Sequence, residues 1–393
     1  MNNNYQKIYL QNKDLLDFEV AESAFERVDI EKINRTDQVV GKPSKYIVDI
    51  FKRFVSNKWA VFFFAIFALI IILAILVPPI SAAMGYSAEH PISASGSQFM
   101  YYLPARVVAG SYPTITVSNA TPLLIQTYQN EGILVGTPEE IIPGVAYKIT
   151  YSPYLLDSLK DYYPILGTDA RGVDIWSKLW SSVQISLGVA FAVAVASTVL
   201  GTIYGSIAGA FAGKAVDTIM MRFVEIINGI PTIVWLLILG IVLSGGAEGE
   251  SVSFDNTTII ASLIFVLWFS PAVSTRTYIM RNKDVEYVQA CKTLGGNQAR
   301  IIFSHMIPVI IGRISVIFVN LIPTVIFYEA SLVFLGLKSR LDLSLGLMLY
   351  DAYSVSNISL IISPIVVFGL FTISAQIIAN ALNDAIDPRV VKR

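Results

Sequence analysis

Long apolar runs alternate with short polar segments along most of the 393-residue chain. The first run, Trp59–Ile80, has 22 residues, enough to cross a bilayer core of about 30 Å. Five more follow, at Leu179–Gly213, Ile226–Ala247, Asn256–Thr275, from about Ile307 onward, and at Tyr353–Asn383. A short turn is predicted at Lys214–Arg222, and Gly229 and Pro231 interrupt the run Ile226–Ala247. The pattern therefore predicts an all-α polytopic membrane protein with six transmembrane helices.

Basic residues favour one orientation of these helices. The segments predicted to lie inside hold most of the Lys and Arg: ten in 1–58, two in 214–222, five in 276–305 and three in 389–393. The outer loop 248–255 holds none and the loop 338–351 holds two. The positive-inside rule then predicts that both termini are cytoplasmic. Because a polar segment of 58 residues precedes the first run, we expect no cleavable signal peptide.

Composition agrees with a membrane protein and argues against several kinds of chemistry. Charged residues make up 15% of the chain, against about a quarter in soluble proteins. A single cysteine and two histidines argue against a disulfide framework or a metal centre. The segment Gly209–Lys214 has too few residues between its glycines for a nucleotide-binding loop. We expect no catalytic residue, metal or cofactor in this chain.

Residues 81–165 differ from the rest of the chain. They mix Pro, Gly, Ser, Thr and Tyr, and 81–178 holds only five Lys or Arg. Three runs have β-type composition, at Tyr112–Val117, Leu123–Tyr128 and Tyr147–Tyr151. We expect a small β-rich extracytoplasmic insertion.

A polar elbow at Glu286–Pro308 interrupts the apolar pattern. Before Gly295 an apolar residue recurs every three positions, at Val285, Val288, Cys291 and Leu294, which predicts a short helix with these residues along one face as an apolar ridge. Gly295 and Gly296 end this short helix, and Asn297 is suited to cap the next one. Pro308 suits the first turn of the helix that follows. The elbow also has a basic flank, formed by Arg281, Lys283, Lys292 and Arg300.

The elbow resembles the EAA loop of ABC-importer permeases in the dipeptide, oligopeptide and nickel branch, and within that branch the C-type subunit of oligopeptide permeases. Gln289, Ala290 and Cys291 occupy the Glu-Ala-Ala positions, with Gly295 four residues and Pro308 seventeen residues after Cys291. Gln and Cys depart from the family pattern and remove one carboxylate. The resemblance implies that these residues, with Glu286 and His305, couple the chain to an ATPase.

A second stretch, Leu166–Lys178, resembles a segment just outside a membrane helix in the same branch. It contains Gly167, Thr168, Asp169, Gly172 and Asp174. Two interpretations stay open, because such aspartates can cap a following helix or form an extracytoplasmic gating or docking site. The C-terminal Asn383–Arg389 also resembles the family's last segment.

The resemblance implies a type I ABC-importer fold in a bacterial cell membrane. The resemblance covers 59–80 loosely and 164–389 well, but not about 85–155. With the apolar pattern it predicts a cytoplasmic tail at 1–58, the first helix at 59–80, the insertion at 81–165 and a core permease domain at 166–383. The core holds five helices and the coupling loop 284–308, and a second cytoplasmic tail follows at 384–393. The resemblance also implies several partners: a homologous second permease, two ATPase subunits that bind ATP and Mg, an extracytoplasmic binding protein and a peptide substrate. No nucleic acid is expected.

Glu329 is the one candidate for a pathway residue. An intramembrane carboxylate can line a water-filled path or serve a structural role near the outer edge, and both interpretations stay open. The alternative cargo is nickel or another small solute. A secondary transporter is a rival class, but it predicts internal repeats, which the chain does not show convincingly. A membrane-anchored receptor is a second rival class, but it needs only one span, so six predicted spans argue against it.

Overall fold

The computed structural model describes residues 46–89, 102–108, 110–243, 254–338, 342–354 and 358–386. The chain divides into two units, Met1–Asp49 and Ile50–Arg393, and helix α4 (Tyr46–Ser56) begins in the first and ends in the second. Predictions for the first 45 residues, most of the loop 248–255, Arg340 and residues 387–393 lie outside the described ranges. The predicted limits of the tails, insertion and core domain stay predictions.

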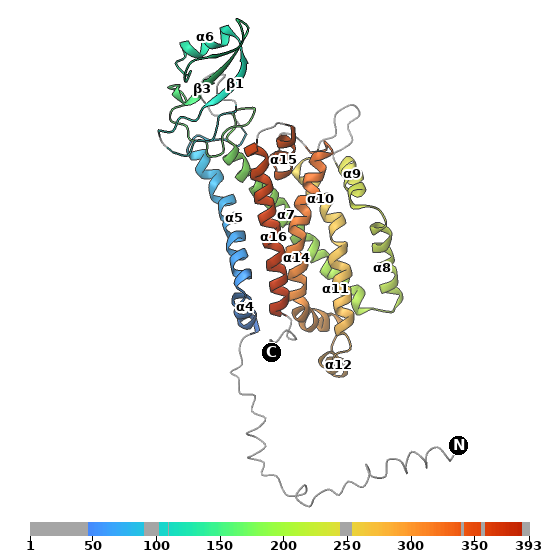
Figure 1. The fold of residues 1–393 in the computed structure, drawn as a ribbon. Helices are drawn as coiled ribbons and strands as arrows, with labels where there is room; N and C mark the ends of the chain where they lie inside the picture. The colour runs from blue at the N-terminus through green and yellow to red at the C-terminus, as the bar shows by residue number, and fades with distance from the viewer. Residues whose placement is uncertain are drawn as a thin grey trace, which may run out of the picture. The chain divides into compact units, whose positions relative to one another are not determined.

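Helices make up most of the second unit (Figure 1). Five helical stretches are long and apolar enough to cross a membrane alone: α5 (Lys58–Ala83), α7 (Ile175–Ala210), the pair α10 (Asn256–Leu267) and α11 (Phe269–Asn282), the run from α13 (Gln298–Arg300) through η4 (Ile301–Met306) to α14 (Ile307–Phe334), and α16 (Ile358–Ile386). A bent pair, α8 (Ala215–Asn228) and α9 (Thr232–Leu243), brings the number to six if it is counted as one span. The predicted helical membrane fold is confirmed.

The third span is broken rather than continuous. The axes of α8 and α9 differ by 87°, and Gly229 and Pro231 lie at the break. Pro231 cannot donate a backbone hydrogen bond, which helps to explain why the helix stops there. The indole Nε1 of Trp235 donates to the carbonyl of Ile227 at 2.9 Å, across the break. The break confirms the interruption predicted at Gly229 and Pro231. The predicted short turn at 214–222 is wrong, because α8 occupies these residues from Ala215 onward.

Close packing of α7 on α11 depends on glycine. Gly201, Gly205 and Gly209 face α11, and a methyl group on Gly205 would collide with the carbonyl oxygen of Ala272. Small residues allow helix backbones to approach closely. Close packing matters in lipid, because an apolar side chain gains little free energy when it moves from lipid into a helix interface. By contrast, a methyl group on Gly188 would meet nothing within 4 Å.

The insertion contains an antiparallel sheet with the strand order β1-β3-β2 (Figure 1). Its strands are β1 (Ile115–Ala120), β2 (Glu139–Ile142) and β3 (Ala146–Tyr151), with Val117 opposite Ile149 and Glu140 opposite Tyr147. The predicted strand at Leu123–Tyr128 is wrong, because α6 (Pro122–Asn130) occupies those residues. Thr121 caps this helix and Pro122 opens it, and these start signals outweigh the β-type composition.

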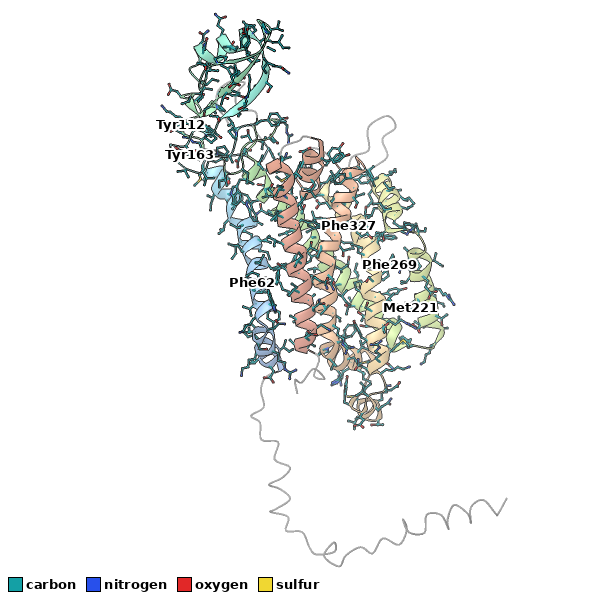
Figure 2. All side chains as sticks on the ribbon, in the orientation of Figure 1. Phe62, Tyr112, Tyr163, Met221, Phe269 and Phe327 are labelled. Carbon is teal, nitrogen blue, oxygen red and sulfur yellow. The ribbon has the colours of Figure 1, made fainter. Side chains whose placement is uncertain are left out.

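Arg106 ties two distant parts of the insertion together. It is 2% exposed, and its guanidinium lies 5.4, 4.8 and 4.5 Å from the ring centres of Tyr112, Tyr154 and Tyr163. It also donates to the carbonyl of Lys160 at 2.7 Å. Figure 2 shows Tyr112 and Tyr163 near each other at one end of the insertion. The segments before β1 and after β3 therefore share this cation–π cluster.

The predicted outer loop at 338–351 is partly helical. Helix α15 (Leu345–Ser354) packs between α7 and α14, with the amide of Leu345 donating to Ser186 Oγ at 3.0 Å. Gly346 lies against Ala330 of α14. Tyr353 belongs to α15, and α16 starts at Ile358, so the prediction that the sixth span begins at Tyr353 is wrong.

Candidate functional site

The elbow has the local structure that its sequence predicts. Helix α12 (Glu286–Thr293) ends before Gly295, whose φ of +78° lies in the left-handed region that favours glycine. The amide of Gly296 donates to the carbonyl of Cys291 at 2.9 Å and closes the turn. Asn297 then caps α13 by accepting from the amide of Ala299 at 3.3 Å.

The predicted apolar ridge on α12 does not face one way. Val288 is 1% exposed and packs with Ile279, Ile301 and Met306, which fixes the elbow to the bundle. Leu294 is 87% exposed. Residues three apart differ by 300° around a helix, so four of them spread over half its circumference. The prediction of a single ridge is therefore wrong, since one member faces inward and another outward.

The outward side of α12 carries the EAA-like positions. Glu286, Gln289 and Ala290 are exposed, and Cys291 is half-buried. The side-chain amide of Gln289 donates to Asp284 at 3.4 Å. The exposed positions leave α12 with a free surface beyond the ends of the spans.

The second half of the elbow runs without a break into a membrane span. His305 is exposed within the π-helical turn Ile301–Met306, and Pro308 lies in the first turn of α14 as predicted. Wide π turns are rare and often mark functional sites. A displacement of the elbow would therefore act directly on α14.

Close backbone packing shapes the second candidate site, at the N-terminal end of α7. Gly167 and Gly172 have φ of +84° and +76°. A methyl group on Gly167 would collide with the carbonyl of Leu103. Thr168 Oγ1 accepts from the amide of Leu103 at 2.7 Å, and the Thr168 amide donates back to Leu103 at 3.0 Å. The loop is thus fixed to the insertion.

Asp169 organises this loop and anchors it to the bundle. Its Oδ1 accepts from the amides of Arg171 and Val173 at 2.8 and 3.0 Å. Its Oδ2 lies 3.0 Å from the ammonium of Lys178, which is 1% exposed and also pairs with Asp351 of α15 at 2.9 Å. This triad joins the loop, α7 and α15.

Asp174 caps α7, which supports the capping interpretation at this position. Its Oδ2 accepts from the amide of Ser177 at 2.7 Å, while its Oδ1 is buried and has no hydrogen-bond partner in the described part of the chain. Burial raises the pKa of Asp174 to about 6, against the lowering effect of the backbone amides that it accepts. A docking role for this loop stays a prediction.

Glu329 forms a buried ion pair instead of facing solvent. Both Glu329 and Lys338 have fully buried side chains, and their charged atoms lie 2.5 Å apart. Lys338 follows a turn at Gly336, and its backbone forms a bridge with that of Phe254. In this conformation the pair favours the structural interpretation of Glu329 over the pathway interpretation.

Three ionisable partners were not predicted from the sequence. Lys178, Asp351 and Lys338 were placed in loops or at helix ends without a role, although Lys178 and Lys338 are buried and paired, and Asp351 is the half-buried second partner of Lys178. A fourth pair, Asp217 with Arg276, joins α8 to α11. The signal was present in principle, because a charged residue near an apolar span needs a partner.

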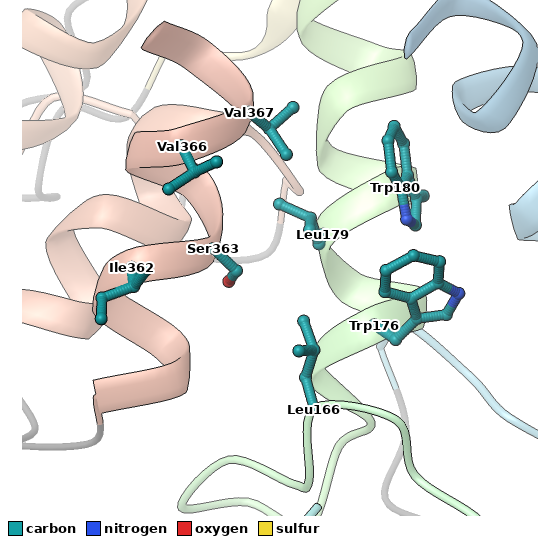
Figure 3. A pocket seen from close by; sticks show the side chains of 8 residues that line it. All are labelled: Leu166, Trp176, Leu179, Trp180, Ile362, Ser363, Val366 and Val367. Atoms are coloured by element: carbon teal, nitrogen blue, oxygen red, sulfur yellow. The ribbon is translucent and has the colours of Figure 1, made fainter. Parts of the chain in front are cut away.

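A pocket of about 360 Å³ lies between α7 and α16, next to the loop Gly167–Asp174 (Figure 3). Leu166, just before Gly167, reaches it from below the first turn of α7, where Trp176 and Trp180 also line it. Within the described ranges no group of three His, Cys, Asp or Glu could hold a metal ion.

Comparison with known proteins decides the family. A family profile described as the binding-protein-dependent transport system inner membrane component matches residues 201–392. The N-terminal TM domain of oligopeptide transport permease C matches residues 45–99. The chain is 49% identical to the oligopeptide transport system permease protein OppC of Mycoplasma pneumoniae, over 95% of this chain and 98% of that protein. The chain belongs to the OppC-type permease family.

Other members show how far the similarity extends. OppC of Mycoplasma genitalium is 47% identical over 94% of the chain and 97% of that protein. OppC of Bacillus subtilis is 32% identical over 45% of the chain and 56% of that protein. A solved structure of the MetNI methionine ABC transporter matches 53% of this chain and 96% of its own, with 16% identity and a TM-score of 0.43. The type I permease fold follows from the family match, and the chain is a multi-pass membrane component.

Proposed function

We propose that the chain is one permease subunit of an ABC importer that carries short peptides into a bacterial cell. The observation that carries this proposal is the near full-length similarity to a protein named as an oligopeptide permease. Six spans form half of a translocation pathway, and a homologous second permease supplies the other half. Both termini lie in the cytoplasm, which the distribution of Lys and Arg supports.

The elbow is the coupling element in this proposal. Glu286, Gln289 and Ala290 present an exposed helix face to a groove on an ATPase subunit, the helix-in-groove mode of recognition. Gly295 sets the angle of the elbow, and Val288 makes the elbow move with the bundle. Closure of two ATPase subunits on ATP and Mg then moves α12, and through His305 and Pro308 it moves α14, as a rigid-body change of access.

The outer surface receives the cargo from an extracytoplasmic binding protein. The loop Gly167–Asp174 and the insertion form the docking side in this proposal, with Asp169 and Lys178 fixing the loop to the helices. Peptide side chains vary widely, and a pathway wall that is poor in charge passes them without selecting among them. Ion pairing inside the protein occupies the buried charges of Glu329 and Lys338.

Uptake measurements test the cargo. A strain lacking only this chain is expected to lose uptake of labelled peptides of about two to ten residues, and to regain it when the chain is restored. Nickel uptake is measured in parallel. If peptide uptake persists while nickel or another solute is lost, the cargo is not peptide, and the permease architecture is unaffected.

A further inference from the structure

Helix α4 (Tyr46–Ser56), just before the first span, has one apolar and one polar side. At 100° per residue, Ile50, Phe51, Phe54 and Val55 share one side of the helix. Lys52, Arg53 and Ser56 fall on the other side, together with Asp49. The described chain covers the apolar side only in part: Ile50 and Phe54 are half-buried, whereas Phe51 is 66% and Val55 47% exposed.

The chain bends between α4 and the span. Asn57 has an extended backbone and caps α5 by accepting from the amides of Trp59 and Ala60 at 3.1 and 3.3 Å. The rings of Phe54 and Phe64 lie 6.1 Å apart, although ten residues of straight helix would separate them by about 15 Å along the axis. Therefore α4 does not continue the axis of α5 and leaves it at the membrane end.

Cations gather at this bend. Lys52, Arg53 and Lys58 are all exposed, and Asp49 is the one carboxylate between residues 49 and 59. Trp59, the first large residue of the span, is 70% exposed. Tryptophan concentrates where apolar and polar zones of a membrane meet. The charges of α4 thus lie at the depth where α5 enters the bilayer.

We propose that α4 lies in the interface of the leaflet at which α5 begins and binds anionic phospholipid headgroups there. Phe51 and Val55 enter the boundary of the acyl chains, and Lys52, Arg53 and Lys58 contact the phosphates. A helix with one apolar face and a basic polar face binds membranes in this way. In the proposed orientation this is the cytoplasmic leaflet.

The exposed surface of α5 supports lipid as the occupant. Only 17% of the apolar window of α5 is buried, against 28–44% for the other four single spans. Val61 and Phe62 continue the exposed apolar surface directly after Trp59, and Figure 2 shows Phe62 on α5. Because the exposed apolar surface of α5 continues onto α4, we expect lipid to cover both. The proposal requires α5 to cross the membrane and is independent of peptide import.

Spin labels on the full chain test the depth of α4. In a Cys291→Ala background, Phe51→Cys or Lys52→Cys carries a nitroxide, and the chain is purified with its partner subunits and placed in vesicles of phosphatidylcholine with phosphatidylglycerol. The label at 51 is expected to collide severalfold more often with oxygen than with a water-soluble nickel chelate. The label at 52 is expected to show the opposite preference.

The headgroup part of the proposal has its own test. Phosphatidylcholine alone, or the variant Lys52→Gln/Arg53→Gln/Lys58→Gln, is expected to raise chelate collisions at position 51. The matched variant Lys148→Gln/Lys160→Gln removes exposed charge from the insertion and is expected to change nothing. Equal chelate access at 51 and 52 would overturn the interfacial location. A label at 51 that neither reagent reaches would assign the apolar face to a protein chain. Low chelate access at 51 in phosphatidylcholine alone and in the triple variant would overturn the recognition of anionic headgroups.

Discussion

The buried ion pair between Glu329 and Lys338 makes both residues sensitive to single substitutions. Removing one partner leaves a charge without solvent or counter-ion, which costs about 3–5 kcal/mol in buried pairs. We expect Lys338→Met to lower the free energy of unfolding by that amount, measured by thermal unfolding in detergent. Replacing both residues by Met removes both charges and is expected to recover most of the loss.

An exposed pair provides the control for this measurement. Lys148 and Glu139 form a salt bridge with side chains that are 48% and 72% exposed. Lys148→Met is expected to change the free energy of unfolding by less than about 1 kcal/mol, because exposed pairs contribute little. Equal effects of Lys338→Met and Lys148→Met would contradict the structural role of the buried pair.

Asp174 is expected to make stability depend on pH. Its pKa rises from 3.8 to about 6 on folding, so the folded state holds the proton more tightly. The stabilising effect of protonation is complete below pH 4 and is lost as the pH rises through 6. Asp174→Asn keeps an acceptor for the Ser177 amide and removes the titration. The variant is expected to gain on the order of 2–3 kcal/mol over wild type between pH 4 and pH 7.

The measurement is the difference in melting temperature between Asp174→Asn and wild type across this pH range. Effects of pH on all other groups cancel in the difference. A difference that stays constant from pH 4 to pH 7 would show that Asp174 does not titrate there.

Sequence patterns predicted residues that act locally and missed those that act through distant partners. Asn297 as a cap and Gly295 as a break are confirmed, because both depend on neighbours within a few positions. One partner of Lys178 is Asp351, 173 residues away, and no local pattern joins them. The interpretations of Glu329 stayed open for a different reason, because its partner Lys338 is near in sequence but the pairing depends on how the chain turns back at Gly336 after α14.

Helices and strands were predicted well where hydrophobic length decided them. The apolar runs identify the spans, yet the same runs conceal the 87° break between α8 and α9. A hydropathy average over a window carries no information on the direction of a helix axis. In the sequence, only Gly229 and Pro231 indicated the break. In the insertion, Leu123–Tyr128 looked like a strand, because β-type composition is a weaker signal than the helix start at Thr121 and Pro122.

The contact between α7 and α11 is expected to reject even a methyl group. Gly205→Ala places a Cβ against the Ala272 carbonyl and is expected to destabilise the protein by about 1–3 kcal/mol. Gly188→Ala on the same helix meets open space and is expected to be neutral or to stabilise by up to about 1 kcal/mol. Thermal unfolding of the two variants compares them directly. A similar loss in both would contradict the packing explanation, because helix propensity favours alanine at both positions.

The elbow is expected to depend on the backbone conformation of Gly295. Its surroundings are open, so a side chain there is opposed by the positive φ rather than by a neighbour. Gly295→Val is expected to remove ATP-driven uptake while leaving the chain in the membrane, because a β-branched residue disfavours this conformation. Gly295→Asn, which tolerates it, is expected to retain uptake.

Uptake and stimulation of the ATPase are measured together for both Gly295 variants. Wild-type uptake in Gly295→Val would count against the elbow as the coupling element. Loss in both variants would mean that the partner groove rejects any side chain at this position.

The whole molecule is expected to expose its insertion and its elbow on opposite sides of the membrane. Leu123 is 75% and Leu294 87% exposed, so cysteines there are accessible to reagents. In a Cys291→Ala background, Leu123→Cys is expected to react with an impermeant maleimide on intact cells. Leu294→Cys is expected to react only after the inner face is opened. Labelling of Leu294→Cys on intact cells would refute the orientation.

The break between α8 and α9 bears on how the chain is synthesised. Helix α9 has 12 residues and spans about 18 Å, which is too short to cross the bilayer core, and α8 carries Asp217, Arg222 and Glu225. Neither helix has the run of about 20 apolar residues that a transmembrane helix needs. In addition, Arg276, the partner of Asp217, lies in α11. The ribosome delivers α11 only after α8 and α9 have emerged. We therefore expect residues 215–243 to wait at the edge of the translocation machinery until α10 and α11 arrive, so that this part of the chain inserts as a group of helices and not one at a time.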